Sequence, residues 1–159
     1  MRTALWALGF LVGCGGGAGE ISGSFGEHEM TRIKTAFHGG PNILLVSEKM
    51  DCLDAAWVDR NYGDEAPEEA RTDFLALQFT YTGGDIPAAT VSLEGVSSAR
   101  AFAIAKSGET WEVENGTGGN LAVSSVGDEV EGTFDVTFGG TGGSLSGSFT
   151  TEYCRNIDP

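Results

Sequence analysis

The chain has little positive charge, few histidines and no apolar run long enough to cross a membrane. Its 159 residues include nine basic and 23 acidic residues, which gives a net charge of −14 at pH 7, and only two histidines. Such a surface repels phosphate groups, so we expect no nucleic-acid partner. The apolar stretch at residues 4–12 is about half of the roughly 20 residues that a transmembrane helix needs. The sequence therefore predicts no permanent transmembrane helix.

The first 14 residues have the pattern of a secretory leader. Arg2 places a positive charge before the apolar stretch at residues 4–12, and these are the first two parts of a signal peptide. The motif Leu11-Val12-Gly13-Cys14 resembles the lipobox of bacterial lipoproteins, in which the chain is cut before the cysteine and lipid is attached to its thiol. The resemblance implies a signal peptide at residues 1–13 and lipidation, including palmitate, at Cys14. The alternative is an ordinary signal peptide with a spare cysteine.

The chain that remains after this cleavage has the length of one domain. Removing residues 1–13 takes Arg2 away and leaves eight basic and 23 acidic residues, a charge of −15. Residues 14–19, which are mostly glycine, are expected to form a flexible tether to the lipid. Residues 20–159 are expected to form a single β-domain. Several acyl chains on one cysteine would make the attachment to the membrane durable.

The three cysteines predict one disulfide. If Cys14 carries lipid, then Cys52 and Cys154 remain as a pair in a compartment outside the cytoplasm, where disulfides persist. The alternative is two buried free thiols. A zinc site is not predicted, because two distant cysteines without a partnered histidine lack the spacing of zinc ligands.

Hydrophobic patterning predicts an all-β domain with one short helix. The clearest strand spans residues 130–138, where apolar residues and glycine alternate with polar ones. The expected strand at residues 74–81 places Leu75, Leu77, Phe79 and Tyr81 on one face. Short strands separated by glycine-rich turns favour an antiparallel β-sandwich or a partly closed β-barrel of about eight or nine strands. The other expected strands are residues 21–25, 32–38, 42–47, 89–93, 99–106, 110–114, 120–125 and 145–153.

The expected helix follows residue 50, and the glycine clusters are expected to be turns. Asp51 can cap a helix whose apolar face would contain Leu53, Ala56 and Trp57 and which would carry Cys52. The clusters at residues 116–119 and 139–143 do not contain the lysine of a phosphate-binding loop or precede a helix. Both are therefore interpreted as hairpin turns.

Several motifs together resemble a group of small lipoproteins of Gram-negative bacteria that has no assigned reaction. They are the lipobox at residues 11–14, Gly26-Glu27-His28, a cysteine after Ile43-Leu44-Leu45-Val46-Ser47, Gly132-Thr133-Phe134-Asp135, and Gly147-Ser148-Phe149 before Cys154. The resemblance implies a lipoprotein of the outer membrane, facing either the periplasm or the cell surface. Gly15 after the cysteine, in place of Asp, favours the outer membrane.

No catalytic template fits the sequence, so no catalytic residue and no cofactor is predicted. His28-Glu29 begins a zinc-protease pattern, but Arg32 stands where the second histidine is required. His38 lies at the end of an expected strand, before two glycines. The run at residues 143–147 has leucine where a nucleophile elbow needs serine.

One acidic segment is a weak candidate for calcium. Its oxygen ligands would be Asp59, Asn61, Asp64 and Glu65. It lacks the glycine at the sixth position and the glutamate at the twelfth position of an EF-hand loop, so the main interpretation is a solvated acidic loop and no metal site is predicted.

Three functions remain, and two of them are preferred to the third, a hydrolytic enzyme, for which the sequence supplies only two histidines. The favoured one is a lipid-anchored structural or interaction module that contacts an envelope protein, for which we expect an exposed apolar or aromatic patch and no deep cavity. The alternative is a β-barrel carrier of a small apolar ligand, with a cavity lined by residues such as Phe74, Phe79, Phe102 and Phe134.

Overall fold

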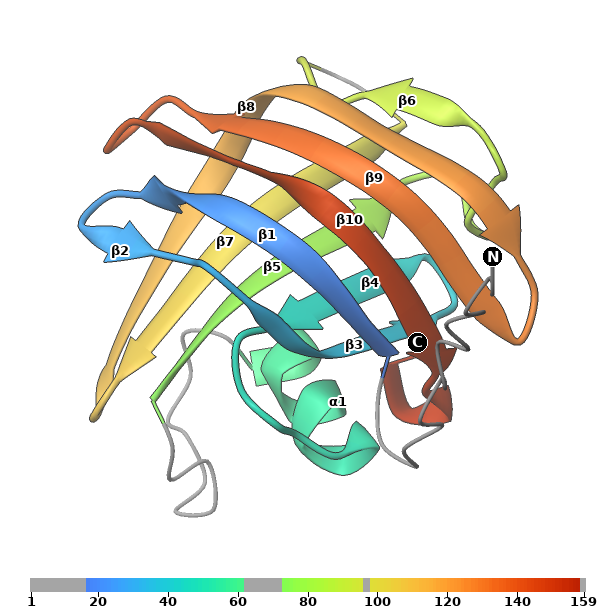
Figure 1. Cartoon of the computed structure of the whole chain (residues 1–159), viewed down its shortest axis with the longest axis horizontal. Helices are drawn as coiled ribbons and strands as arrows, with labels where there is room; N and C mark the ends of the chain where they lie inside the picture. Colours follow the sequence, from blue (N-terminus) through green and yellow to red (C-terminus); the bar gives the residue numbers. More distant parts are fainter. Residues whose placement is uncertain (1–16, 62–72, 96–97, 158–159) are drawn as a thin grey trace, which may run out of the picture.

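The computed structural model describes residues 17–61, 73–95 and 98–157, which form a closed antiparallel β-barrel with one α-helix outside it (Figure 1). Eight strands close the ring in the order β1-β10-β9-β8-β7-β5-β4-β3 and back to β1. They are β1 (Gly17–Phe25), β3 (Ile33–Gly39), β4 (Asn42–Val46), β5 (Phe74–Tyr81), β7 (Ala99–Ser107), β8 (Thr110–Val126), β9 (Glu129–Phe138) and β10 (Gly143–Tyr153). Two short strands are added, β2 (His28–Glu29) beside β1 and β6 (Thr90–Ser92) beside β8. The fold class predicted from the sequence is confirmed in its barrel form.

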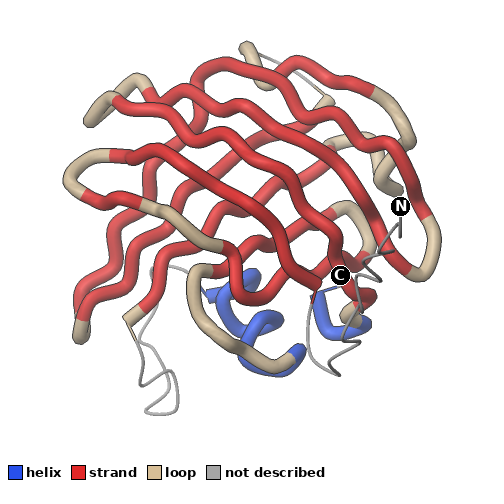
Figure 2. Tube along the Cα trace, viewed as in Figure 1, coloured by secondary structure: helices blue, strands red, loops and turns tan. Residues whose placement is uncertain are grey.

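The ring closes between β1, β3 and β10. Strand β1 pairs antiparallel with β10 from Ala18 opposite Thr150 to Phe25 opposite Gly143. Beyond the start of β1, β10 pairs with β3 in the parallel direction for two residues. There the amide of Cys154 donates to the carbonyl of His38 at 2.7 Å. The chain therefore returns to its own first strand, and the tube of strands in Figure 2 leaves no long free edge.

Side chains of the protein itself fill the barrel. The rings of Phe79 and Phe134 lie 5.6 Å apart between centroids, and Phe149 lies 6.3 Å from Phe134. The faces predicted for β5 and β9 are confirmed, because Leu75, Leu77, Phe79 and Tyr81 of β5 and the apolar residues of β9 face this interior. An eight-stranded barrel is just wide enough for such filling. Other buried members of this cluster are Ile21, Phe25, Ile43, Leu45, Leu77, Leu121, Val136 and Leu145.

Helix α1 (Cys52–Asn61) covers the outer face of β3, β4, β5 and β7, as the lower part of Figure 1 shows. Asp51 caps it as predicted, since its Oδ1 accepts the amides of Leu53 and Asp54, both at 2.9 Å. The buried face contains Ala55, Ala56 and Val58. The expected apolar face is wrong at Leu53, which is 69% exposed, and the side chain of Trp57 lies outside the described part. Among the described residues, no helix combines the length and the apolarity that crossing a membrane would require.

The predicted disulfide joins α1 to the end of β10. The sulfur atoms of Cys52 and Cys154 are 2.10 Å apart. Beyond Cys154, the short 3₁₀ helix η1 (Arg155–Ile157) places Ile157 in the same outer cluster as Leu44 and Val46 of β4. The amide of the Asn42 side chain donates to the carbonyl of Ile157 at 3.2 Å. The C-terminal segment is thus fixed to the wall that α1 covers.

Three expectations from the sequence need correction. Residues 116–119 are not a hairpin turn but part of the single long strand β8, whose register against β9 shifts between Gly116 and Gly118. Strand β1 begins at Gly17, so residues 17–19 belong to the barrel wall and not to the tether. The expected strand at residues 32–38 would place Ile33 and Phe37 on one face by two-residue alternation, but they lie in different clusters because a β-bulge shifts the register of β3 against β1.

Candidate binding site at the barrel rim

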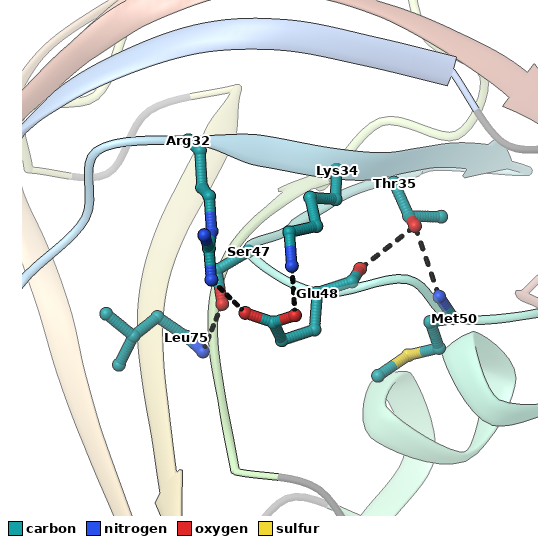
Figure 3. Close-up of polar contacts among 7 residues, drawn as sticks. All are labelled: Arg32, Lys34, Thr35, Ser47, Glu48, Met50 and Leu75. Carbon is teal, nitrogen blue, oxygen red and sulfur yellow. Dashed lines mark hydrogen bonds and ion pairs between the residues drawn. The ribbon is translucent and has the colours of Figure 1, made fainter.

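The barrel wall is interrupted where β4 ends. Val46 pairs with Thr35 on one side and Ala76 on the other, and both neighbouring strands continue beyond it. The chain then leaves the wall toward α1, with Ser47 still bound to β5: its amide donates to the Leu75 carbonyl at 2.8 Å, and its hydroxyl accepts the Leu75 amide at 2.9 Å (Figure 3). The hollow at this place has a volume of about 360 Å³. We call it the rim notch, lined by residues 28–32, 47–48, 73–75 and 105–107.

One carboxylate at the rim notch binds two cations. The guanidinium of Arg32 donates to one oxygen of Glu48 at 2.6 Å, and the ammonium of Lys34 donates to the other at 2.5 Å (Figure 3). These hydrogen bonds, that of Lys34 first, hold the pKa of Glu48 below its usual value. The Thr35 hydroxyl donates to the backbone carbonyl of Glu48 at 2.9 Å and accepts the Met50 amide at 3.2 Å. The segment that carries Glu48 is therefore fixed to β3 by both side chain and backbone.

A buried lysine lies at the other side of the notch. Lys106 is only 5% exposed. It stands between Phe74 of β5 and Trp111 of β8 on the outer face of the sheet. These two rings contact each other edge to face at 5.5 Å between centroids. The ammonium donates to the carbonyl of Gly108 at 2.9 Å.

The floor of the notch is apolar and continuous with the barrel interior. Met30 and Ala105 are buried in the interior cluster, and Leu75 packs against it. A molecule in the notch would therefore contact both apolar groups and the charged groups of the rim. Clefts of this mixed character at the mouth of a barrel are common places for ligand binding.

Two further contacts hold the neighbouring part of the rim. His28 Nε2 lies 2.9 Å from a carboxylate oxygen of Glu112, which joins β2 to β8. The Glu114 carboxylate accepts the amides of Gly140 and Thr141 at 2.8 and 3.2 Å, which fixes the β9–β10 turn. On this side of the rim, β8 is therefore bound both to β2 and to the β9–β10 turn.

The second histidine lies away from the notch. His38 is buried near the end of β3, where its Nδ1 is 2.8 Å from the hydroxyl of Thr151. Burial lowers the pKa of His38. The two histidines thus sit in separate contacts, and nothing in the described residues joins them in one site.

The other residues singled out in the sequence are dispersed. Cys14, Asp64 and Glu65 lie outside the described residues, while Asp59 and Asn61 belong to the last turns of α1 and not to a loop. Within the described residues, no group of three or more His, Cys, Asp or Glu side chains could hold a metal ion. The four phenylalanines expected around one cavity do not meet: Phe79 and Phe134 lie inside the barrel, whereas Phe74 and Phe102 are at outward positions.

Sequence patterns did not indicate the rim notch. Its charged residues come from segments far apart in the chain, and Lys106 lies near the end of β7, directly after the apolar residues 101–105. Its burial depends on aromatic residues of two neighbouring strands, which no local pattern encodes. Comparisons of the chain with protein-family models, with curated proteins and with solved structures find no match.

Proposed function

We propose that this protein is a lipid-anchored β-barrel of the bacterial cell envelope that acts as a binding module through its rim notch. The observation that carries the proposal is the contrast between a barrel interior filled by the chain's own aromatic and aliphatic residues and an open hollow at the rim. A ligand at the notch needs no rearrangement of the interior. We propose binding without catalysis, in the outer membrane, with Cys14 carrying the lipid.

Two features support the location in the envelope. The leader and the motif Leu11-Val12-Gly13-Cys14, which resembles a lipobox, support a lipid on Cys14. A disulfide between Cys52 and Cys154 is typical of proteins in an oxidising compartment such as the periplasm. Cys14 is three residues before Gly17, the first residue of β1, so the chain between them can span no more than about 11 Å. A lipid on Cys14 would hold the barrel close to the membrane surface.

The lipid anchor is tested by metabolic labelling with a clickable fatty acid. The wild-type protein is expected to take up the label and Cys14→Ala to lose it. Cys154→Ala is the matched control, because it removes a cysteine that is not proposed to carry lipid, and it should keep the label. Equal labelling of wild type and Cys14→Ala would refute the anchor.

The binding role is tested by plugging the notch. Thr31 is exposed and lines it, so Thr31→Trp fills the hollow without disturbing the core. Native mass spectrometry of protein purified from the envelope should show a small bound molecule in the wild type and none in Thr31→Trp. Thr110→Trp, at an exposed position of β8 outside the notch lining, should retain it. A molecule retained equally by all three proteins would place its binding elsewhere.

Contact with an envelope protein is the second candidate, because two exposed apolar side chains flank the disulfide. Leu53 follows Cys52 and is 69% exposed, and Tyr153 precedes Cys154 and is 54% exposed. A photo-crosslinking residue at position 53 should capture one defined partner in intact cells. The same residue at position 126, which is exposed but lies at the end of β8, should not. Identical products from both positions would argue against a partner at this surface.

A further inference from the structure

We propose that the outer face of β1, β10, β9 and β8 is a docking surface for a basic polypeptide segment. This surface shares no lining residue with the rim notch, so it is a second binding surface and not an extension of the first. The proposal follows from the kind of side chains on this face, from the spacing of its carboxylates and from the place of the basic residues in the fold.

The outward side chains of these strands are small, and most of them carry a hydroxyl group. Residues paired across neighbouring strands project from the same side of the sheet and form rows across it. The three rows that we call the hydroxyl face are Ala18, Thr150, Glu131 and Ser125; Glu20, Ser148, Thr133, Ala122 and Thr90; and Ser22, Ser146, Asp135, Asn120 and Ser92. They contain no aromatic ring and no aliphatic side chain larger than that of alanine. The hydroxyl face therefore offers no apolar patch to a lipid.

The hydroxyl face is hollowed, because its side chains are small. One shallow hollow has a volume of about 650 Å³, and its lining includes Glu20 and Glu131. A second hollow of about 420 Å³ is lined in part by Ser22 and Ser146 and shares Glu20 and Ser148 with the first. Together they run over β1, β10 and β9, which lie side by side in Figure 1. A segment laid across these strands would reach both the carboxylates and the hydroxyl groups.

Three carboxylates surround the hydroxyl groups at wide and similar spacing. Glu131 and Asp135 are four residues apart on β9, which is about 13 Å in an extended strand. Glu20 lies two strands away in the row of Thr133, midway between them, so it is about 12 Å from each. A metal ion needs oxygen ligands within about 2.6 Å, so one ion cannot be held by carboxylates at this spacing. The arrangement fits several cationic groups carried by one molecule.

The basic residues of the protein lie away from the hydroxyl face. Residues 107–154, which form β8, β9 and β10, include eight acidic residues and no lysine or arginine, and β1 contains Glu20 and no basic residue. Among the described residues, the ion pairs involve Glu48 and Glu112, and none involves Glu20, Glu131 or Asp135. This face therefore carries charge of one sign only. Such a surface attracts a cationic partner and increases its rate of association.

A polypeptide matches both the charge and the hydroxyl groups of this face. Lysine or arginine side chains four residues apart in an extended segment are separated by about 13 Å, which equals the spacing of Glu131 and Asp135. The backbone of such a segment presents both N–H donors and C=O acceptors, and hydroxyl groups bind either kind. A nucleic acid would be repelled by the carboxylates.

A nine-residue peptide with lysine at positions 1, 5 and 9 and serine or glycine elsewhere is the probe. It is titrated at low salt into the mature chain carrying Cys14→Ser. The amide NMR signals of Thr133 and Ser148 report on the hydroxyl face, and that of Thr31 reports on the rim notch. We expect the peptide to shift the first two signals and not the third. A peptide with glutamine in place of each lysine should shift none of them, and one with three adjacent lysines should bind more weakly.

Neutralising the three carboxylates tests the contact directly. The variant Glu20→Gln/Glu131→Gln/Asp135→Asn should raise the Kd of the lysine peptide roughly 10-fold, as expected for three exposed ion pairs. The matched control is Glu27→Gln/Asp85→Asn/Glu109→Gln, which removes the same charge from exposed positions in the connections between strands. It should raise the Kd less than about threefold, since distant exposed charges are screened. Urea unfolding of both variants shows whether their folds are intact.

Three outcomes would overturn the proposal. Equal effects of the two triple variants would mean that the peptide is attracted by net charge and not by the hydroxyl face. Equal affinities of the lysine and glutamine peptides would mean that the face does not select a basic partner. Shifts at Thr31 without shifts at Thr133 and Ser148 would place the peptide at the rim notch.

Discussion

The eight strands of the barrel form two walls whose outer faces differ. The covered wall consists of β3, β4, β5 and β7, and helix α1 packs on its outer face. The open wall consists of β1, β8, β9 and β10, and its outer face is exposed to solvent. All five residues of β4 are buried, whereas β9 alternates strictly between buried and exposed residues. The interior is the same for both walls, so the difference arises entirely outside the barrel.

The two outer faces show how one barrel combines a rigid scaffold with a binding site. The covered wall is buried on both faces, and β4 at its centre therefore has the continuous apolar run Ile43-Leu44-Leu45-Val46. The open wall carries small polar residues such as Ser22, Thr133 and Ser146. The rim notch lies where the covered wall is interrupted, at the point where the chain leaves β4 to form α1. The segment that leaves β4 to form α1 therefore also leaves the gap in the wall at which the rim notch lies.

The largest expected effect comes from removing the disulfide that holds helix α1 to the end of β10. The disulfide closes a loop of 102 residues between α1 and β10, and the chain-entropy model assigns about 4.7 kcal/mol to a loop of about 100 residues. The double variant Cys52→Ala/Cys154→Ala should therefore lose roughly 4 kcal/mol in urea unfolding. Hydrogen exchange should increase first in α1 and less in β9. An equal increase of hydrogen exchange in α1 and β9 would show that helix α1 does not unfold separately from the barrel.

A pair of substitutions on the two outer faces gives the next largest effect. Leu44 is fully buried between β4 and α1, and Leu44→Ala should reduce the free energy of unfolding by about 2–5 kcal/mol because it leaves a cavity. Ser146 is exposed on the outer face of β10, and Ser146→Ala should change it by less than about 0.5 kcal/mol. Denaturant unfolding of both variants measures the contrast. Comparable losses would mean that the open wall is also covered in solution.

The open wall was the easier half to predict from the sequence. Its strands bury one face, so β9 shows a complete two-residue alternation of buried and exposed residues. The glycines at residues 116–119 were misinterpreted because a β-bulge and a turn use the same residues. On the covered wall, the sequence indicated the capped helix and the disulfide. It did not indicate which face of α1 is buried, since Leu53 is exposed while Ala55 is buried.

The candidate site could not be predicted from the sequence for a physical reason. Arg32 and Glu48 are 16 residues apart, and they meet because β3 and β4 pair antiparallel, which brings the start of β3 beside the end of β4. Lys106 is buried because Phe74 and Trp111 flank it from neighbouring strands. These contacts depend on register and on the place where β4 ends. The pattern of charges along the chain predicts neither the strand register nor the residue at which β4 ends.

A glycine substitution tests how closely the open wall is packed. Gly132 is an inward position of β9, and a Cβ added there would lie 2.7 Å from Cζ of Phe149 and 2.5 Å from the carbonyl oxygen of Ala122. Gly132→Ala should therefore cost about 1–3 kcal/mol by overpacking. Gly83→Ala is the control, because a Cβ at that position meets nothing within 4 Å. Equal free energies of unfolding for the two variants would show that the wall accommodates a Cβ at position 132 without destabilisation.

The smallest expected effect concerns the junction of the covered wall with the rim notch. Glu48 is held by Lys34 and Arg32, which keep its pKa below the usual value of 4.5. A lowered pKa in the folded state stabilises the protein above pH 4.5, and this contribution is lost as the pH falls through the folded-state pKa. Glu48→Gln should therefore reduce stability by about 1 kcal/mol or less at pH 7. The variant and the wild type should converge in acid.

Thermal unfolding between pH 3 and pH 7 measures this convergence. Glu131→Gln, which neutralises an exposed glutamate on the open wall, is the matched control and should change stability less than Glu48→Gln at neutral pH. High salt should diminish the effect of Glu48→Gln, because the ion pairs are partly exposed to solvent. A constant difference between Glu48→Gln and wild type across this pH range would mean that the loss arises from packing and not from the charge of the carboxylate.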